Sequence, residues 1–288
     1  MTQARVIVIG NEKGGAGKST IAFHVLASLL HAGARVGVID LDLRQQSMGH
    51  FLASRRTWAA SADAKLPMPT EYLLSDDPVK LAQTTATDPV EAVARLEGAM
   101  QAAHAANDFI IIDTPGGDTA LSRAAHGQAD QIVTPMNDSF VDFDLLGRVD
   151  PVTLDLKKPS IYAETVWEAR KVKAATRGAT IDWIVLRNRL ASAEARNRRR
   201  VEDRMAALAK RVGFRIGAGL RDRVIYRELF PFGLTVADLS ATVRPIPVAI
   251  SHVAARQELR LLTQTLGLEP EPAAAAAPAE AEPVLAAS

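Results

Sequence analysis

The 288-residue sequence predicts an α/β protein with a mostly parallel, doubly wound sheet that carries helices on both faces. The first observation behind this prediction is that short apolar runs alternate with segments whose apolar residues recur at helical spacing. That order requires right-handed crossover connections between parallel strands. The second is a glycine-rich segment after the first apolar run, which has the composition of a phosphate-binding loop.

Five segments are expected to be strands buried on both faces of the sheet. Each is a short run rich in Val, Ile or Leu, which is typical of strands inside a parallel sheet. They are residues 5–10, 35–40, 108–113, 131–135 and 181–186. Because ligands bind beyond the carboxyl ends of such strands, the polar residues that follow these runs are candidates for chemistry.

Residues 18–32 and 88–106 are expected to be helices, and residues 1–268 are expected to form a single domain. Residues 269–288 consist of Ala, Pro and Glu with little else. Such a segment buries too little apolar surface to offset the entropy lost on ordering, so we expect a disordered tail.

The composition excludes several classes of protein. The chain contains no cysteine, which rules out disulfides, thiolate zinc sites, cysteine-ligated iron–sulfur clusters and a cysteine nucleophile. No apolar run approaches the ~18 residues that cross a bilayer, and we expect a cytoplasmic protein.

A net charge of +1 conceals a basic segment at residues 187–227, where twelve Arg and one Lys face four acidic residues. Such a concentration is a candidate surface for a polyanion such as DNA, and a solvated helix face is the alternative. The expected DNA contacts are Arg196, Arg198, Arg199, Arg200, Arg204, Arg221 and Arg223.

Residues 13–20 read KGGAGKST between a predicted strand and a predicted helix. Glycines let the backbone wrap a phosphate chain with its N–H groups pointing inward. Lys18 supplies a charge to the β- and γ-phosphates, and the hydroxyl of Ser19 can ligate Mg²⁺. The expected ATP-binding residues are Gly14, Gly15, Ala16, Gly17, Lys18, Ser19 and Thr20.

Carboxylates follow two of the predicted strands. Asp40 and Asp42 end the second strand, and Asp113 ends the third. A carboxylate in this position can hold the magnesium shell or orient a water for in-line attack. We expect Ser19, Asp113 and one of the two carboxylates after the second strand, Asp40 or Asp42, at the metal. Asp113, Gly116 and Gly117 are expected to form a switch that responds to the γ-phosphate.

Lys13 distinguishes this loop from the ordinary P-loop pattern, whose first glycine is replaced here by Glu12. The pattern KGGxGK[ST] with an early lysine resembles the deviant Walker A motif of the ParA/MinD ATPases over about residues 5–265. The resemblance implies a P-loop ATPase that uses ATP and Mg²⁺ and forms a homodimer when ATP is bound. It implies catalytic roles for Lys13, Lys18 and Asp42, in which Lys13 reaches the partner's phosphates and Asp42 orients the water. It also implies that Asp40 lies at the Mg²⁺ ion.

Asn188 and Arg189 follow the fifth predicted strand. An asparagine offers both a donor and an acceptor, which match the Watson–Crick edge of adenine. The family resemblance assigns adenine recognition to this position, and an Asx turn is the alternative.

Within the ParA/MinD family, the stretches NEKGGAGKSTIAFH, VIDLDLRQQS and FLASRR are most similar to the MipZ group of division-site regulators of alphaproteobacteria. This resemblance implies slow, regulatory ATP hydrolysis, inhibition of FtsZ assembly, binding to ParB and to nonspecific DNA, and a nucleoid-associated polar gradient without membrane insertion. A ParA-type segregation ATPase shares every motif and stays an alternative. A metabolic P-loop kinase or ligase is the alternative from another class, although the sequence contains no evident cluster for its substrate.

Overall fold

The computed structural model describes residues 3–62, 64–75, 77, 79, 83, 88–137, 145–150, 156–188, 195–239 and 250–268. Its strands are β1 (Arg5–Ile9), β2 (Val36–Asp40), β3 (Thr70–Glu71), β4 (Phe109–Asp113), β5 (Gln131–Asn137), β6 (Gly147–Val149), β7 (Leu156–Pro159), β8 (Asp182–Asn188) and β9 (Arg215–Ala218). Its α-helices are α1 (Lys18–His31), α2 (Ser47–Ser61), α4 (Pro89–Ala106), α5 (Ala120–Gln128), α6 (Ile161–Arg177), α7 (Ala195–Leu208), α8 (Val224–Leu229) and α9 (Ile250–Thr265). The predicted tail, residues 269–288, lies outside the described residues.

Seven strands form one sheet in the order β3-β2-β4-β1-β5-β8-β9, and every neighbouring pair is parallel. This confirms the predicted fold class and all five predicted strands. The list of strands was incomplete, because it lacked both edge strands and the antiparallel β6–β7 hairpin. β3 has only two residues, and most residues of β9 are exposed, so neither produces the apolar run that marks a central strand.

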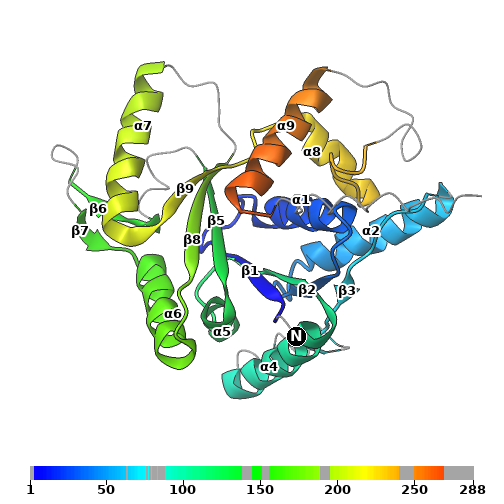
Figure 1. Ribbon diagram of the computed structural model, residues 1–288, viewed down its shortest axis with the longest axis horizontal. Coiled ribbons are helices and arrows are strands. Elements are labelled where there is room, and N and C mark those ends of the chain that lie inside the picture. Colours follow the sequence, from blue (N-terminus) through cyan, green and yellow to red (C-terminus); the bar gives the residue numbers. More distant parts are fainter. Residues whose placement is uncertain are drawn as a thin grey trace, which may run out of the picture.

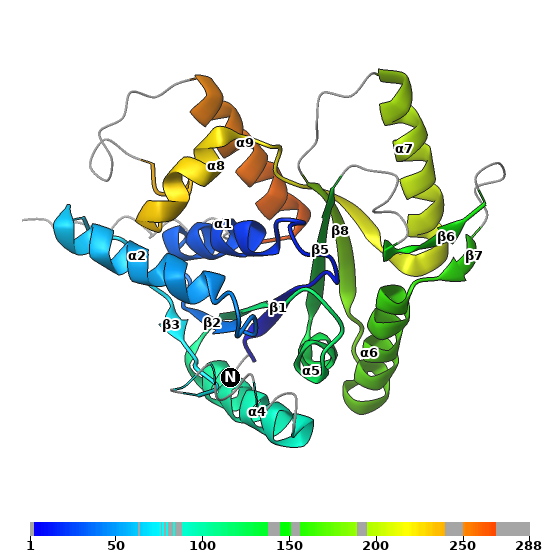
Figure 2. The same cartoon turned by 180° about the vertical axis from the view of Figure 1, so that it is seen from behind.

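Helices cover both faces of the sheet (Figures 1 and 2). Side chains that alternate along each strand build two cores, one on each face. In β1, Val6 and Val8 pack in the core that α4, α5, α6 and α7 cover. Ile7 and Ile9 pack in the other core, beneath α1, α2, α8 and α9. Burial of this apolar surface stabilises the fold by about 25 cal/mol per Å², and both faces contribute.

The carboxyl ends of the central strands meet at one edge of the sheet and are held together by backbone hydrogen bonds. The N–H of Leu41, just after β2, donates to the carbonyl of Asp113 at 2.9 Å, and that of Thr114, just after β4, donates to Ile9 at 3.1 Å. These bonds fix the loops after β1, β2 and β4 against one another. Among the described helices, none has both the length and the apolar character needed to span a bilayer.

Candidate functional site

The loop between β1 and α1 depends on glycine at two positions. Gly15 has φ of 73° and Gly17 has φ of 92°, a left-handed conformation that costs other residues roughly 1–2 kcal/mol. Gly17 is also the N-cap residue, directly before α1. The free N–H groups and the positive end of the helix dipole therefore lie at this loop, which makes it an anion site.

A cavity of about 790 Å³ adjoins the loop, a size typical of ligand sites. It is lined by the predicted residues Gly14, Gly15, Gly17, Lys18, Ser19, Thr20, Asp42 and Gly116. Glu12, Arg44 and Arg123 also line it, and no spacing in the sequence singled them out. Lys13 is partly exposed and does not line this cavity, and its carbonyl accepts a hydrogen bond from the Lys18 ammonium at 3.0 Å.

The Lys18 side chain is buried at the head of α1. Burial lowers the pKa of its ammonium, while the negative charges of Asp113 and Asp42 act in the opposite direction. A phosphate chain in the cavity would favour the charged ammonium in the same way as these carboxylates do.

Asp113 is fully buried at the end of β4, and neither of its oxygens has a partner of good hydrogen-bond geometry in the described part of the chain. Burial raises the pKa of Asp113 to about 7, although the nearby Ser19 hydroxyl favours the charged form. A buried carboxylate without partners is costly, and a hard cation such as Mg²⁺, which prefers oxygen ligands, would satisfy it.

The donor set fits magnesium held jointly by protein and nucleotide. The described residues contain no group of three His, Cys, Asp or Glu side chains that could chelate a metal alone. Mg²⁺ in phosphate sites is usually bound through one or two protein oxygens, substrate phosphates and waters, and Ser19 and Asp113 can supply that protein share. Bound Mg²⁺ would neutralise charge on the transferring phosphate.

Asp40 differs from expectation, because its carboxylate already has backbone partners. One oxygen accepts the N–H of Asp42 at 2.9 Å, and the other accepts the N–H of Met48, in the first turn of α2, at 3.0 Å. Burial raises the pKa of Asp40 to about 6 despite these hydrogen bonds. Asp40 thus anchors the start of α2, and this geometry does not favour the metal role expected for it.

The loop after β4 packs directly on the phosphate loop. A Cβ atom added to Gly116 would lie 3.3 Å from the backbone nitrogen of Gly14, so a side chain there would press on the loop. Gly117 has φ of 118°, which favours glycine. Gly116, one of the predicted switch residues, therefore packs against the segment that would hold the phosphates.

The Asn188 amide also differs from expectation. It donates to the carbonyl of Ala16 at 2.8 Å, and its oxygen accepts the N–H of Leu220 at 3.1 Å. Both polar ends thus join the phosphate loop to the loop after β9, and base reading by Asn188, which also lines a second cavity, stays a prediction. The second cavity, of about 200 Å³, adjoins Thr20 and the loop after β9 and could take the base. Arg189 lies outside the described residues.

The predicted DNA contacts fall into two groups on opposite faces of the sheet. Arg204 is partly buried on α7, whose Met205 packs with α6, whereas Ile225 of α8 packs on the other face. The side chains of Arg196, Arg198, Arg199 and Arg200, also on α7, are not among those that the structure describes. The structure thus does not gather all seven arginines into one patch.

Arg221 and Arg223, just before α8, both face Glu258 of α9. Arg223 pairs with this carboxylate at 2.6 Å and Arg221 at 3.6 Å. Both arginines also line the second cavity. This arrangement favours a role beside the nucleotide more than contact with DNA.

A family model described as "ATPase MipZ" matches residues 5–270. The maintenance of carboxysome distribution protein A of Halothiobacillus neapolitanus is 26% identical over 254 residues, which cover 87% of this chain and 95% of the relative. The chromosome partitioning protein ParA of Myxococcus xanthus is 30% identical over 182 residues, which cover 58% of this chain and 64% of the relative.

Solved structures share the fold. A complex of a McdA variant from Cyanothece with ATP superposes with a TM-score of 0.60 at 19% identity, over 93% of this chain and 98% of that one. The septum site-determining protein MinD of Pyrococcus horikoshii with Mg-ADP gives 0.53 at 18% identity, over 89% and 94%. Together with the phosphate loop and the match over residues 5–270, these findings show that the chain belongs to the MipZ family of ParA/MinD-type ATPases, which use ATP and Mg²⁺.

Proposed function

We propose that this protein is an ATP-dependent dimerising switch that positions the division site by inhibiting FtsZ assembly. The observation that carries the proposal is the family match to MipZ over residues 5–270. ParB and nonspecific DNA would couple the switch to chromosome segregation, and the protein would form a nucleoid-associated polar gradient. The hydrolysis of ATP would be slow, since a switch needs a long-lived state.

The phosphate site supports a switch because two loops could respond to the γ-phosphate. Gly116 lies against Gly14, so a change in the phosphate loop would alter the segment that leads to α5. Asp40 joins the end of β2 to Met48 at the start of α2. A change at the phosphate site could therefore also reach α2. Asp42, between these contacts, lines the cavity where a water could be oriented for in-line attack.

A positioning ATPase for another cargo is the second candidate. It is favoured by the relatives' names, since they include a carboxysome distribution protein and a chromosome partitioning protein. Both candidates predict a dimer with ATP, so only a partner assay distinguishes them.

The test is sedimentation of FtsZ polymers with and without this protein. With ATP, and more strongly with the Asp42→Ala variant, the fraction of pelleted FtsZ should fall, whereas ADP should leave it unchanged. Size-exclusion chromatography under the same conditions controls for dimerisation. If a dimer forms with ATP while FtsZ pelleting is unaffected, division inhibition is wrong and a positioning ATPase for another cargo is favoured.

A further inference from the structure

A groove is formed by residues of α4, α5 and α6, on the face of the sheet that these helices cover. Figures 1 and 2 show α5 lying between α4 and α6 on that face. α5 has nine residues, while its neighbours α4 and α6 have 18 and 17. The short helix forms a floor between two longer walls. The hollow has a volume of about 660 Å³.

The groove is apolar and open. Its floor contains Ala124 and Gly127, and a Cβ added to Gly127 would meet no atom within 4 Å. Along the α6 wall, Ile161 is 66% exposed and Val172 is 54% exposed. Large apolar side chains gathered along one groove are typical of interaction sites.

The shape and lining favour a helix as the occupant. Strand addition needs a free sheet edge, and here the sheet is covered by α5. Polyproline segments dock on aromatic grooves, and none of the described residues that line this groove is aromatic. An amphipathic helix would pack on the two helical walls as a further helix does in a bundle.

The charges at the rim favour a basic helix. Glu97 on α4 and Glu164 on α6 make no ion pair with any residue that the structure describes, and Glu168 has only an exposed pair with Lys171. Of the groove's two arginines, Arg123 is neutralised by Asp118 at 2.7 Å, whereas Arg177 keeps its charge and donates to the Gln128 side chain at 3.0 Å. Three glutamates against two arginines leave the lining acidic.

The groove is linked to the start of the loop between β1 and α1 by a buried residue of α6 that does not itself line the groove. Tyr162, next to Ile161, donates to the carbonyl of Gly10 at 2.8 Å, and its oxygen lies 3.2 Å from Nε2 of His126 on α5. Nδ1 of His126 lies 2.6 Å from the carbonyl of Ser122, so this nitrogen carries the proton of the neutral ring and Nε2 accepts.

The Tyr162 hydroxyl therefore has one proton to donate and two acceptors within reach, the Gly10 carbonyl and Nε2 of His126. The Thr134 hydroxyl, which accepts from the Trp183 indole at 3.0 Å, is free to donate to the Tyr162 oxygen at 2.9 Å. A small shift of α5 against α6 would decide whether the Tyr162 hydroxyl donates its hydrogen bond to the Gly10 carbonyl or to Nε2 of His126. A Cβ on Gly10 would lie 2.7 Å from His126. Gly10 and His126 are therefore packed so closely that a shift of α5 would be transmitted to Gly10.

We propose that the groove between α4 and α6 binds a basic amphipathic helix of a partner protein, and that its occupancy reaches the phosphate loop through Tyr162 and His126. The inference depends on the ATPase activity of the family and not on inhibition of FtsZ. A bound helix that spans α6 from Ile161 to Arg177 would be ~24 Å, or about 16 residues, long.

Binding is tested with a labelled synthetic helix of about 16 residues, with Leu on one face and Lys on the other, followed by fluorescence anisotropy. Ile161→Asp and Val172→Asp should each weaken binding by about tenfold or more, as expected for central apolar anchors. Leu261→Asp is the matched control, since Leu261 is 43% exposed on α9 across the sheet. A second peptide with Glu in place of Lys should not bind.

Equal binding of both peptides, or equal binding to groove and control variants, would overturn the docking site. Self-association of the protein that Ile161→Asp abolishes would also overturn it, because the groove would then be a contact between copies of this chain.

Coupling to the phosphate loop is tested by filling the groove chemically, which the absence of native cysteine allows. A bulky maleimide on Gly127→Cys should change ATP turnover by about threefold or more, within the range that packed networks transmit. The matched control is the same label on Gly98→Cys, an exposed α4 position with open space around it that does not line the groove.

Tyr162→Phe should remove the response to the Gly127 label, while the unlabelled cysteine variants keep wild-type turnover. Equal turnover of the two labelled variants would refute the coupling. Because unlabelled protein reports ATPase activity separately, loss of coupling is distinguishable from loss of the activity itself.

Discussion

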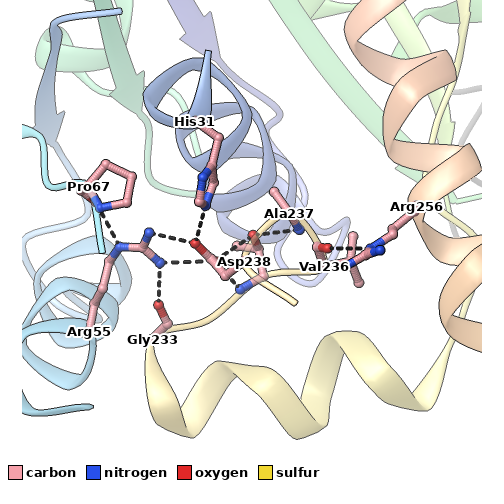
Figure 3. Close-up of polar contacts among 9 residues, drawn as sticks. His31, Arg55, Pro67, Gly233, Val236, Ala237, Asp238 and Arg256 are labelled. Carbon is pink, nitrogen blue, oxygen red and sulfur yellow. Dashed lines mark hydrogen bonds and ion pairs between the residues drawn. The ribbon is translucent and has the colours of Figure 1, made fainter. Parts of the chain in front are cut away.

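Arg55 and Asp238 form a two-point ion pair that is almost fully shielded from solvent (Figure 3). The two guanidinium nitrogens of Arg55 donate to the two carboxylate oxygens at 2.9 and 2.6 Å. The ring of His31 on α1 lies 2.7 Å from the same carboxylate, and the carbonyl of Gly233 accepts from Arg55 at 3.0 Å. The pair thus joins α2, which starts at the phosphate site, to the segment after α8, which lines the second cavity.

Asp238→Asn should destabilise the fold by about 3–5 kcal/mol, because it leaves the buried Arg55 charge uncompensated. Urea unfolding monitored by circular dichroism measures this change. Asp108→Asn is the control, since its pair with Arg35 is solvent-exposed and should contribute about 0–1 kcal/mol. Similar losses for the two variants would contradict the role assigned to the buried pair.

The same pair predicts how stability depends on pH. Burial by itself would raise the pKa of Asp238, but hydrogen bonds from His31 and Arg55 and the Arg55 charge hold it well below its usual range. A group whose pKa falls on folding contributes stability above its unfolded pKa and loses it as the pH falls through the folded one. The free energy of unfolding of the wild type should exceed that of Asp238→Asn by a constant amount above about pH 5, and this difference should shrink in acid. A difference that shrinks only in alkali would contradict this.

Asp42→Ala should keep nucleotide binding but slow ATP hydrolysis by ~10²-fold or more, as expected for loss of a water-orienting group. The variant should therefore accumulate as the ATP-bound dimer. Phosphate release and size-exclusion chromatography measure the two effects, and Asp203→Ala, at an exposed position on α7, is the control. Hydrolysis near the wild-type rate would show that Asp42 does not orient the water.

Lys13→Ala should impair ATP-driven dimerisation or hydrolysis more than nucleotide affinity of the monomer. The side chain of Lys13 does not line its own subunit's phosphate cavity, in keeping with the role across a dimer that the family resemblance implies. Sedimentation velocity with a non-hydrolysable ATP analogue, together with turnover, checks this, and Lys65→Ala at an exposed position is the control. Unchanged dimerisation and turnover would disprove a role in trans.

The sequence predicted the central strands because residues buried on both faces leave continuous apolar runs, such as Phe109–Asp113. It also predicted the phosphate loop, whose glycines meet a local backbone requirement at Gly15 and Gly17. Edge strands were missed because their exposed residues, as in β9, follow no apolar pattern.

Roles that depend on contacts between distant segments could not be predicted. The Asn188 side chain has the donor and the acceptor that base reading needs, but its amide donates to the carbonyl of Ala16, 172 positions earlier in the sequence. Asp40 follows a strand as a metal ligand would, yet one of its oxygens accepts the N–H of Asp42 and the other accepts the N–H of Met48 at the start of α2. Tyr162 contacts Gly10 across 152 positions, and no local spacing marks such a pair.

DNA binding by the arginine-rich segment is the last prediction, and the structure narrows it to α7. This helix spans residues 195–208 and contains five of the seven arginines expected to contact DNA. Arg223 pairs with Glu258 and lies only 24% exposed near α8, so the phosphate contacts should come from α7. This helix contains no aromatic residue, which makes base stacking unlikely to contribute and favours purely electrostatic contact.

Affinity for DNA should therefore fall with salt and should not depend on sequence. If roughly 4–6 phosphates are neutralised per dimer, the slope of log affinity against log salt should be about −4 to −5, and ATP should raise affinity because a dimer presents two helices. Joint reversal of Arg198 and Arg199 to Glu should weaken binding equally on unrelated duplexes without affecting dimerisation. The control reverses Lys157 and Lys158, an adjacent exposed pair outside the segment. Fluorescence anisotropy at several salt concentrations measures both effects, and equal affinities for the two double variants would disprove the assignment to α7.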